Sequence, residues 1–303
     1  MDKIKQYEQQ FQGNEIMFIM PSLSTGGAER VIVTLIKYLD RSRFKPVLVI
    51  LNEGSNPLDL KEIGCEVELV NLKIKKARYS AITLFNLILK RKPGTVLSTL
   101  GYVNEIVSFL LPVLPKSIKF IARESSIVSK RNALNSNKKI HNWIYHRLIP
   151  RFDLIICQSQ EMYEDLECEY KIPEKKMVII DNPLDIEYIE RRSKEMCKEL
   201  LSENHNIIAV GSLKLVKNYS LLILEAAESP LNHQYFIIGE GVERHNLKEQ
   251  IKDLGLEDKV HLLGHKNNPW KYMAAANEFW QKSEFEGNSN ALKEWKALRH
   301  LND

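Results

Sequence analysis

Short runs of aliphatic and β-branched residues alternate with stretches of helical spacing along most of this chain of 303 residues. Such runs, bounded by Gly, Pro or polar residues, are typical of strands that are buried on both faces. Strands that alternate with helices favour a parallel sheet covered by helices, so we expect an α/β fold. The pattern predicts strands at 16–20, 46–51, 65–70, 95–100, 118–122, 154–157, 207–211, 235–239 and 259–263, and helices at 28–39, 219–227 and 247–254.

The alternation occurs in both halves of the chain, and a chain of this length suggests two domains. We expect one domain over residues 1–184 and a second over residues 185–303, which opens with a charged helical connector at 185–201. Hydrophobic residues make up 44% of the chain, which is enough apolar material for two cores.

Composition and patterning disfavour several classes of protein. No apolar run reaches the roughly 18 residues that a membrane span needs. The first 14 residues are polar and show no signal-peptide pattern, so we expect a cytoplasmic protein. Four widely spaced cysteines form no metal-ligand pairs, so we expect reduced thiols and no metal site. They are Cys65, Cys157, Cys168 and Cys197.

Positive charge is concentrated in residues 71–151, which hold 16 Lys or Arg and two acids, Glu105 and Glu124, a net charge of +14. The rest of the chain carries −10, because the whole chain is +4. A solvated basic face is a common explanation, while an anionic membrane surface, an anionic acceptor or nucleic acid would also suit such a block. Apolar residues between 82 and 89, followed by Lys90-Arg91-Lys92, favour the membrane surface. We expect peripheral association with the inner face of a membrane and no nucleic-acid partner.

Two glutamates near the end of the chain, Glu286 and Glu294, stand eight positions apart around a loop that opens a helical pattern. The first amides of a helix are unpaired and point outward, which makes a natural seat for a phosphate. Glu286 could then contact a sugar and Glu294 a ribose, with a diphosphate between them. Taken alone, a surface loop and an ordinary solvated Glu explain this spacing better. The loop consists of Gly287, Asn288, Ser289, Asn290 and Ala291.

Other motifs accompany this segment in a fixed order, and the set is more specific than any one of them. They are Phe18-Ile19-Met20-Pro21 with Gly26-Gly27-Ala28-Glu29-Arg30, Asp181-Asn182-Pro183, Val210-Gly211-Ser212-Leu213 with Lys217-Asn218, Ile237-Ile238-Gly239-Glu240-Gly241, and Val260-His261-Leu262-Leu263-Gly264. Together with the Glu-x7-Glu spacing, this series resembles the retaining glycosyltransferases of family 4 over roughly residues 15–294. That family has two facing Rossmann-like domains, the GT-B architecture, so the resemblance implies the same fold here.

The resemblance also implies a donor site. Lys217 would bind the donor diphosphate, and Gly26 and Gly27 would let the backbone approach its phosphate or sugar. Gly264 would lie near the nucleobase, while Ser212 stands where the family commonly has an arginine, which removes one cation. Positive charge at the diphosphate can replace a metal ion, so no cofactor is expected. A surface lysine and a plain strand-to-helix turn are the structural alternatives.

Arg123-Glu124-Ser125 follows the strand predicted at 118–122, where many members of the family carry a catalytic or sugar-contacting His. Glu124 could accept a hydrogen bond from the sugar or the acceptor, and we include it with Glu286 as a candidate catalytic residue. A structural Glu–Arg pair is an equally good explanation. His141 and His146 lie in a basic helical segment and are interpreted as surface or acceptor-side residues.

The second predicted domain departs from the family in two places. Residues 274–283 take the position of an apolar strand, but Glu278, Gln281 and Lys282 interrupt it and would bury poorly in a sheet. The sequence also ends at Asp303, before the family's further strands and the helix that returns to the first domain. We therefore expect an incomplete second domain with an open sheet edge, lower stability and weak activity.

The main hypothesis is a retaining, metal-independent glycosyltransferase that moves a sugar from a nucleotide-sugar donor to a surface-glycan or lipid-linked acceptor. The donor diphosphate would lie between the domains, on Lys217 and the amides of residues 287–291. The alternative is a truncated, non-catalytic glycosyltransferase remnant or a nucleotide-sugar-binding module. A dinucleotide-dependent oxidoreductase is disfavoured, because residues 24–28 lack the Gly-x-Gly-x-x-Gly pattern.

Overall fold

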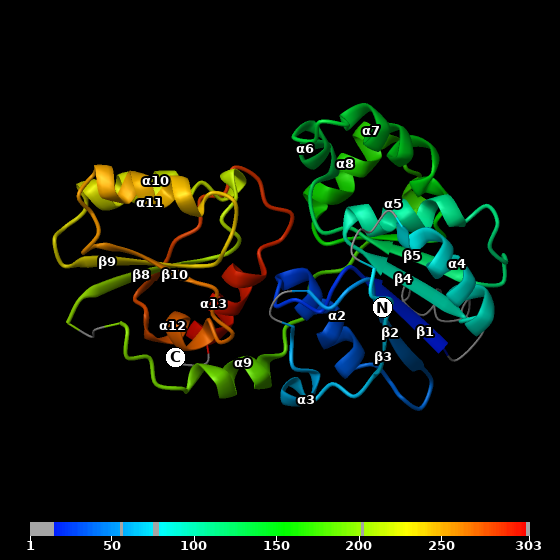
Figure 1. The fold of residues 1–303 in the computed structure, drawn as a ribbon, viewed down its shortest axis with the longest axis horizontal. Helices are drawn as coiled ribbons and strands as arrows, with labels where there is room; N and C mark the ends of the chain where they lie inside the picture. The colour runs from blue at the N-terminus through cyan, green and yellow to red at the C-terminus, as the bar shows by residue number, and fades with distance from the viewer. Residues whose placement is uncertain (1–14, 55–56, 75–78, 201–202, 301–303) are drawn as a thin grey trace. The chain divides into compact units, whose positions relative to one another are not determined.

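The computed structural model describes residues 15–54, 57–74, 79–200 and 203–300. The chain divides into two compact units, Met1–Pro183 and Leu184–Asp303, which we call unit 1 and unit 2. Each unit has its own parallel sheet, and helices pack against it (Figure 1). This is the α/β arrangement that the alternating pattern predicted.

Unit 1 is built on a seven-stranded sheet in which the strand pairs are parallel. The strand order is β3-β2-β1-β4-β5-β6-β7, so the direction in which the sheet grows reverses between β1 and β4. Open parallel sheets bind ligands outside the carboxyl ends of their strands at such a reversal. The strands are β1 Glu15–Met20, β2 Lys45–Ile50, β3 Glu68–Asn71, β4 Thr95–Thr99, β5 Lys119–Arg123, β6 Leu154–Cys157 and β7 Met177–Ile179.

The helices of unit 1 bury apolar residues that are spaced about one turn apart. In α4, for example, Leu84 and Ile88 are fully buried while Ile82 is exposed. The apolar residues at 82–89 therefore belong partly to the core, which weakens their predicted role at a membrane. The helices are α2 Gly27–Lys37, α3 Leu60–Ile63, α4 Ser80–Arg91, α5 Gly101–Leu110, α6 Val128–Ala133, α7 Lys138–Arg147 and α8 Gln160–Tyr170.

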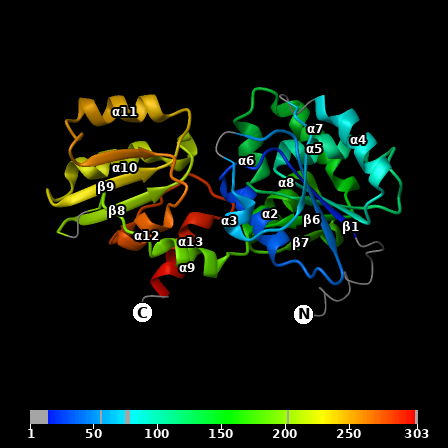
Figure 2. The ribbon, with the colours of Figure 1, turned by 60° about the horizontal axis from the view of Figure 1, so that its bottom comes forward.

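Unit 2 has a four-stranded parallel sheet with the order β10-β9-β8-β11. Helices α10 and α11 lie on one face of this sheet, and α9, α12 and α13 lie on the other (Figures 1 and 2). The strands are β8 His205–Val210, β9 His233–Ile238, β10 Val260–Gly264 and β11 Glu278–Phe279. The helices are α9 Ile186–Ser193, α10 Tyr219–Glu228, α11 Arg244–Asp253, α12 Trp270–Ala275 and α13 Asn290–His300.

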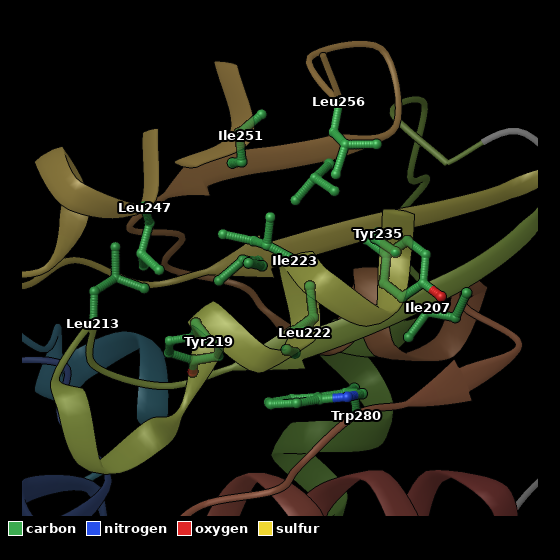
Figure 3. Close-up of a cluster of buried hydrophobic side chains, with 14 residues drawn as sticks. Ile207, Leu213, Tyr219, Leu222, Ile223, Tyr235, Leu247, Ile251, Leu256 and Trp280 are labelled. Atoms are coloured by element: carbon green, nitrogen blue, oxygen red, sulfur yellow. The ribbon is translucent and has the colours of Figure 1, made fainter. Parts of the chain in front are cut away.

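The core between the sheet and helices α10 and α11 contains the buried side chains drawn in Figure 3. Leu222 and Ile223 of α10 pack there with Leu247 of α11. The ring of Trp280, which follows β11, lies 6.2 Å from the ring of Tyr219. This core anchors the first turn of α10, next to the loop that carries the candidate donor site.

Two predicted elements differ from the observed ones. The strand predicted at 65–70 begins only at Glu68, because the amide of Cys65 donates back to Leu60 O of α3 at 2.8 Å and is not available for strand pairing. The connector predicted as a helix over 185–201 is helical only in α9. Of the residues at 194–200, Leu200 alone is buried, so the segment offers no apolar face that would extend the helix.

The segment at 274–283 forms only a short strand, and Glu278, which was predicted to interrupt that strand, lies within it. β11 has two residues and, among the described strands, pairs only with β8, through Glu278 opposite Ile207. Glu278 and Lys282 are exposed, whereas Trp280 is buried. The indole nitrogen of Trp280 donates to Glu225 at 2.8 Å, so the segment is held by a buried aromatic ring and a hydrogen bond more than by strand pairing.

Candidate donor-binding site

Three loops meet at the carboxyl ends of β8, β9 and β10 in unit 2. Backbone hydrogen bonds join them, from the amide of Gly211 to Ile238 O at 3.0 Å and from the amide of Gly239 to Gly264 O at 2.9 Å. Gly239 has φ +151°, and a Cβ built on it would lie 1.9 Å from Gly211 O. Only glycine fits there, and it allows the loops after β8 and β9 to lie against each other.

The side chains of Lys217 and Glu286 form an ion pair, although they are 69 residues apart in the chain. Ser283 Oγ also donates to Glu286 Oε2, at 3.1 Å. A backbone hydrogen bond of 2.8 Å from the amide of Glu284 to Val216 O holds the two segments together. The structure thus brings the lysine predicted to bind the diphosphate into contact with the glutamate predicted to be catalytic.

Ser212 and Gly264, two other predicted donor-site residues, lie on the same three loops. Ser212 is exposed. Gly264 has φ +73°, and a Cβ there would lie 3.0 Å from Glu240 Oε1, which pairs with Arg244 at 3.0 Å. The positive φ and the close carboxylate both favour glycine at this position, whether or not a nucleobase binds there.

The loop predicted to cradle a phosphate leads into α13. Ser289 caps this helix, because its Oγ accepts from the amide of Leu292 at 3.3 Å and donates to Gln281 Oε1 at 2.6 Å. Glu294 lies one turn before Leu298 on α13 and is 3% exposed. Its predicted contact with a ribose stays a prediction. The other residues of this loop are partly exposed, namely Gly287, Asn288, Asn290 and Ala291.

In unit 1, the predicted glycines stand where β1 leads into α2. Gly26 precedes α2 and its carbonyl accepts from the amide of Arg30 at 3.0 Å, while Gly27 is the first helical residue. A Cβ on Gly26 would lie 2.3 Å from Glu29 Oε2, and Glu29 also accepts a hydrogen bond of 3.1 Å from Ser24. Burial raises the pKa of Glu29. The space above Gly26 is thus filled by this carboxyl, and an approach of donor phosphate to Gly26 stays a prediction.

Glu124 lies in the interior of unit 1 and is 0% exposed. Its Oε1 accepts from Asn104 Nδ2 and from Tyr145 Oη, both at 2.8 Å, and its Oε2 lies 3.5 Å from Arg131 Nη1. The adjacent Arg123 is engaged elsewhere, with Thr99 and Asn182. These surroundings favour the structural alternative for Glu124, although the partner is Arg131 and not its neighbour in the chain.

Arg131 connects Glu124 to a second carboxylate. Its guanidinium passes directly over Gly101, where a Cβ would lie 1.6 Å from Nη1, and reaches Glu105 at 3.6 Å. Glu105 also pairs with His141 Nδ1 at 2.8 Å, so the histidine that we interpreted as a surface or acceptor-side residue is partly buried. His146 is exposed. Local sequence patterns contain no signal for this network, because its members come from four separate elements.

Two further properties bear on cofactors and membranes. Within the described ranges, no three His, Cys, Asp or Glu side chains come together in a way that could hold a metal ion. None of the described helices is both long and apolar enough to span a bilayer.

Each of the two units matches a known family of glycosyltransferases. The family described as Glycosyltransferase Family 4 matches residues 25–188, and the family described as Glycosyl transferases group 1 matches residues 191–299. The first match alone covers more than half of the chain. The protein belongs to glycosyltransferase family 4. This confirms the family predicted from the ordered motifs, and with it a transferase enzyme.

Individual relatives agree with this assignment. A glycosyltransferase of Campylobacter jejuni is 32% identical over 282 residues, which is 90% of this chain and 75% of that protein. Its name is N-acetylgalactosamine-N,N'-diacetylbacillosaminyl-diphospho-undecaprenol 4-alpha-N-acetylgalactosaminyltransferase. The capsular polysaccharide biosynthesis glycosyltransferase CapH of Staphylococcus aureus is 22% identical over 291 residues, which is 92% of this chain and 78% of CapH.

Solved structures confirm the fold of this family 4 glycosyltransferase. The crystal structure of Anabaena Alr3699/HepE in complex with UDP-glucose superimposes with a TM-score of 0.76 at 16% identity, over 94% of this chain and 78% of HepE. The fold class is therefore GT-B, with two Rossmann-like units, as the resemblance implied.

Proposed function

We propose that this glycosyltransferase is a retaining, metal-independent enzyme that moves a sugar from a nucleotide sugar to a lipid-linked or glycan acceptor. The observation that carries the proposal is the meeting of Lys217 and Glu286 beside three loops at the carboxyl ends of parallel strands. Retention of configuration is proposed from the spacing of Glu286 and Glu294, which matches the retaining class. HepE binds UDP-glucose, so UDP is the natural first probe of the donor.

The chemistry assigned to the pair follows from charge. When the glycosidic bond to the diphosphate breaks, negative charge develops on the leaving oxygen, and the ammonium of Lys217 can stabilise it without a metal ion. Positive charge develops at the anomeric carbon, and the carboxylate of Glu286 can stabilise that charge from the sugar side. The ammonium of Lys217 has three N–H donors and uses one of them on Glu286 here, so Glu286 competes with the donor phosphate for this cation.

Replacing Lys217 by Ala is expected to weaken binding of UDP by about 10- to 100-fold, because a charge-assisted contact is worth about 1.5–3 kcal/mol. Titration calorimetry of wild type and variant measures this difference. Lys214→Ala is the matched control, since Lys214 is an exposed lysine of the same loop and its loss should leave the affinity unchanged. Equal affinities for wild type and Lys217→Ala would reject the site. Transfer from UDP-sugars that is unaffected by EDTA would support metal independence, whereas loss of transfer would contradict it.

We also propose that the enzyme docks peripherally on the cytoplasmic face of a membrane, where a lipid-linked acceptor would be presented. The relative in Campylobacter jejuni is named for a diphospho-undecaprenol acceptor, which supports this setting. In unit 1, the exposed apolar side chains Leu134, Ile140 and Trp143 lie on or just before α7. Basic residues of the same helix are exposed beside them, namely Lys138, Lys139 and Arg147. This combination suits an anionic lipid surface.

Fewer basic side chains of residues 71–151 are available to contact a membrane than the net charge of +14 suggests. Arg91 is paired with Glu15 and Glu68, while Arg123 is buried and Arg131 is paired in the Glu124 network. The proposed docking surface is therefore the α7 surface, formed by Leu134, Ile140 and Trp143 with Lys138, Lys139 and Arg147.

Cosedimentation with vesicles that contain phosphatidylglycerol is expected at low salt and should fall as salt is raised, because ions screen the contact with the α7 surface. Replacing Trp143 by Ser should reduce the bound fraction at low salt by about five- to tenfold, since an apolar anchor is lost. Tyr38→Ser is the control, an exposed aromatic residue of unit 1 outside the α7 surface. Binding that does not respond to salt, or that survives Trp143→Ser unchanged, would remove the basis for this surface.

A further inference from the structure

Tyr219 is the first residue of α10; the residue is 4% exposed and belongs to the core of unit 2. Figure 3 shows the ring at the margin of the buried cluster. The ring therefore belongs to the core, and the position of its hydroxyl is set by packing. Neither the motifs nor the proposed chemistry assigns this hydroxyl a role.

The hydroxyl of Tyr219 and the ammonium of Lys217 converge above the Cα of Gly211. A Cβ built on Gly211 would lie 2.9 Å from Tyr219 Oη, 3.5 Å from Lys217 Cε and 3.8 Å from Lys217 Nζ. Because Gly211 has no side chain, the Tyr219 hydroxyl and the Lys217 ammonium can both lie close to its Cα. The N-terminus of α10 begins at Tyr219 itself, and such a terminus favours an anion.

The hydroxyl has no hydrogen-bond partner in the part of the chain that the structure describes. Two other buried tyrosines differ, since Tyr145 donates to Glu124 at 2.8 Å and Tyr272 donates to Glu199 at 2.6 Å. The residue as a whole is buried, but its hydroxyl oxygen is not enclosed, so it can donate a hydrogen bond to a ligand. Burial and the nearby charge of Glu286 raise the pKa of Tyr219, so the hydroxyl keeps its proton and can donate it to an acceptor.

We propose that the Tyr219 hydroxyl is a ligand of the donor diphosphate, donating a hydrogen bond to a phosphate oxygen beside Lys217. This inference rests on the proposed donor site, which it extends by one residue. The diphosphate is favoured over a sugar hydroxyl because the phenol shares its position with a cation and a helix N-terminus, and all three favour an anion. The same ligand would contact the ammonium of Lys217 and accept a hydrogen bond from the Tyr219 hydroxyl.

Tyr219→Phe tests the proposal, because it removes the hydroxyl and keeps the ring in the core. UDP titrated into the variant by calorimetry should bind about tenfold more weakly than it binds wild type. The loss should shrink to less than about twofold for uridine, which has no phosphate. Tyr272→Phe is the matched control, since it removes a buried hydroxyl of the same unit that already has a partner, and its affinity for UDP should equal that of wild type.

The outcomes separate this inference from the proposed function. If Lys217→Ala weakens UDP binding and Tyr219→Phe does not, the donor site stands and the role of Tyr219 is overturned. If neither substitution weakens binding, both fail. If Tyr219→Phe lowers the unfolding temperature and weakens uridine and UDP equally, its role is structural and the inference is again overturned. A loss confined to UDP, with an unchanged unfolding temperature, supports it.

Discussion

Replacing Glu286 by Gln is expected to lower the rate of sugar transfer by at least about 100-fold, because a carboxylate placed to stabilise developing positive charge contributes on that scale. UDP should bind to the variant as tightly as to wild type or up to about fivefold more tightly. Lys217 loses its partner in the ligand-free enzyme and is then available to the diphosphate, and a partly exposed ion pair is worth about 0–1 kcal/mol. A loss of transfer without a loss of binding is expected of a catalytic residue that pairs with a binding residue.

Glu284→Gln is the matched control for this experiment. Glu284 lies in the same loop and its side chain is exposed, so the variant should keep the wild-type rate and affinity. Steady-state transfer assays and calorimetry on the three proteins provide the comparison. A Glu286→Gln variant that transfers sugar at the wild-type rate would show that the carboxylate is not catalytic. A wild-type protein that binds UDP-sugars yet neither transfers nor hydrolyses them would favour the alternative of a nucleotide-sugar-binding module.

Strands of this fold can be predicted from the sequence where they are buried on both faces. β1 and β8 agree with their predicted ranges to within two residues at each end. Each of them lies between two other strands, and its aliphatic run gives a clear pattern in the sequence. β3 is less predictable, since it pairs only with β2 and its first residues, Glu68 and Leu69, are exposed. An edge strand carries a weaker apolar pattern, so its start depends on contacts such as the hydrogen bond from the Cys65 amide to Leu60 O.

In the candidate site too, single residues can be predicted from local motifs, whereas contacts between distant segments cannot. Lys217 and Glu286 can be picked out by motif, but their contact depends on the paths of two loops, and no local pattern encodes it. Gly26 and Glu124 show that a sequence position alone does not reveal which side chains surround a residue. The structure adds that Glu29 lies above Gly26 and that Glu124 is buried, while the contact of either residue with substrate stays a prediction.

The second large expected effect is a loss of stability when Glu124 is removed from its buried network. Replacing Glu124 by Ala is expected to lower the free energy of unfolding of unit 1 by about 3–5 kcal/mol, because removing one partner of a buried pair leaves the other without compensation. Arg131 would lose a carboxylate, and Asn104 and Tyr145 would each lose a 2.8 Å hydrogen bond. Denaturant unfolding followed by circular dichroism measures the loss. Glu161→Ala is the control, since Glu161 forms an exposed pair with Lys130 and should cost less than about 1 kcal/mol.

Glu124→Gln then separates a structural role from a catalytic one. The amide oxygen of Gln can still accept from Asn104 and Tyr145, so most of the network survives and only the charge opposite Arg131 is lost. We expect this variant to unfold at lower denaturant concentration than wild type but to transfer sugar, per folded molecule, within about threefold of the wild-type rate. A catalytic carboxylate would instead lose about 100-fold or more on this substitution. If Glu124→Gln is stable and inactive, the buried position of Glu124 is not its working position, and the catalytic role predicted from the sequence replaces the structural one.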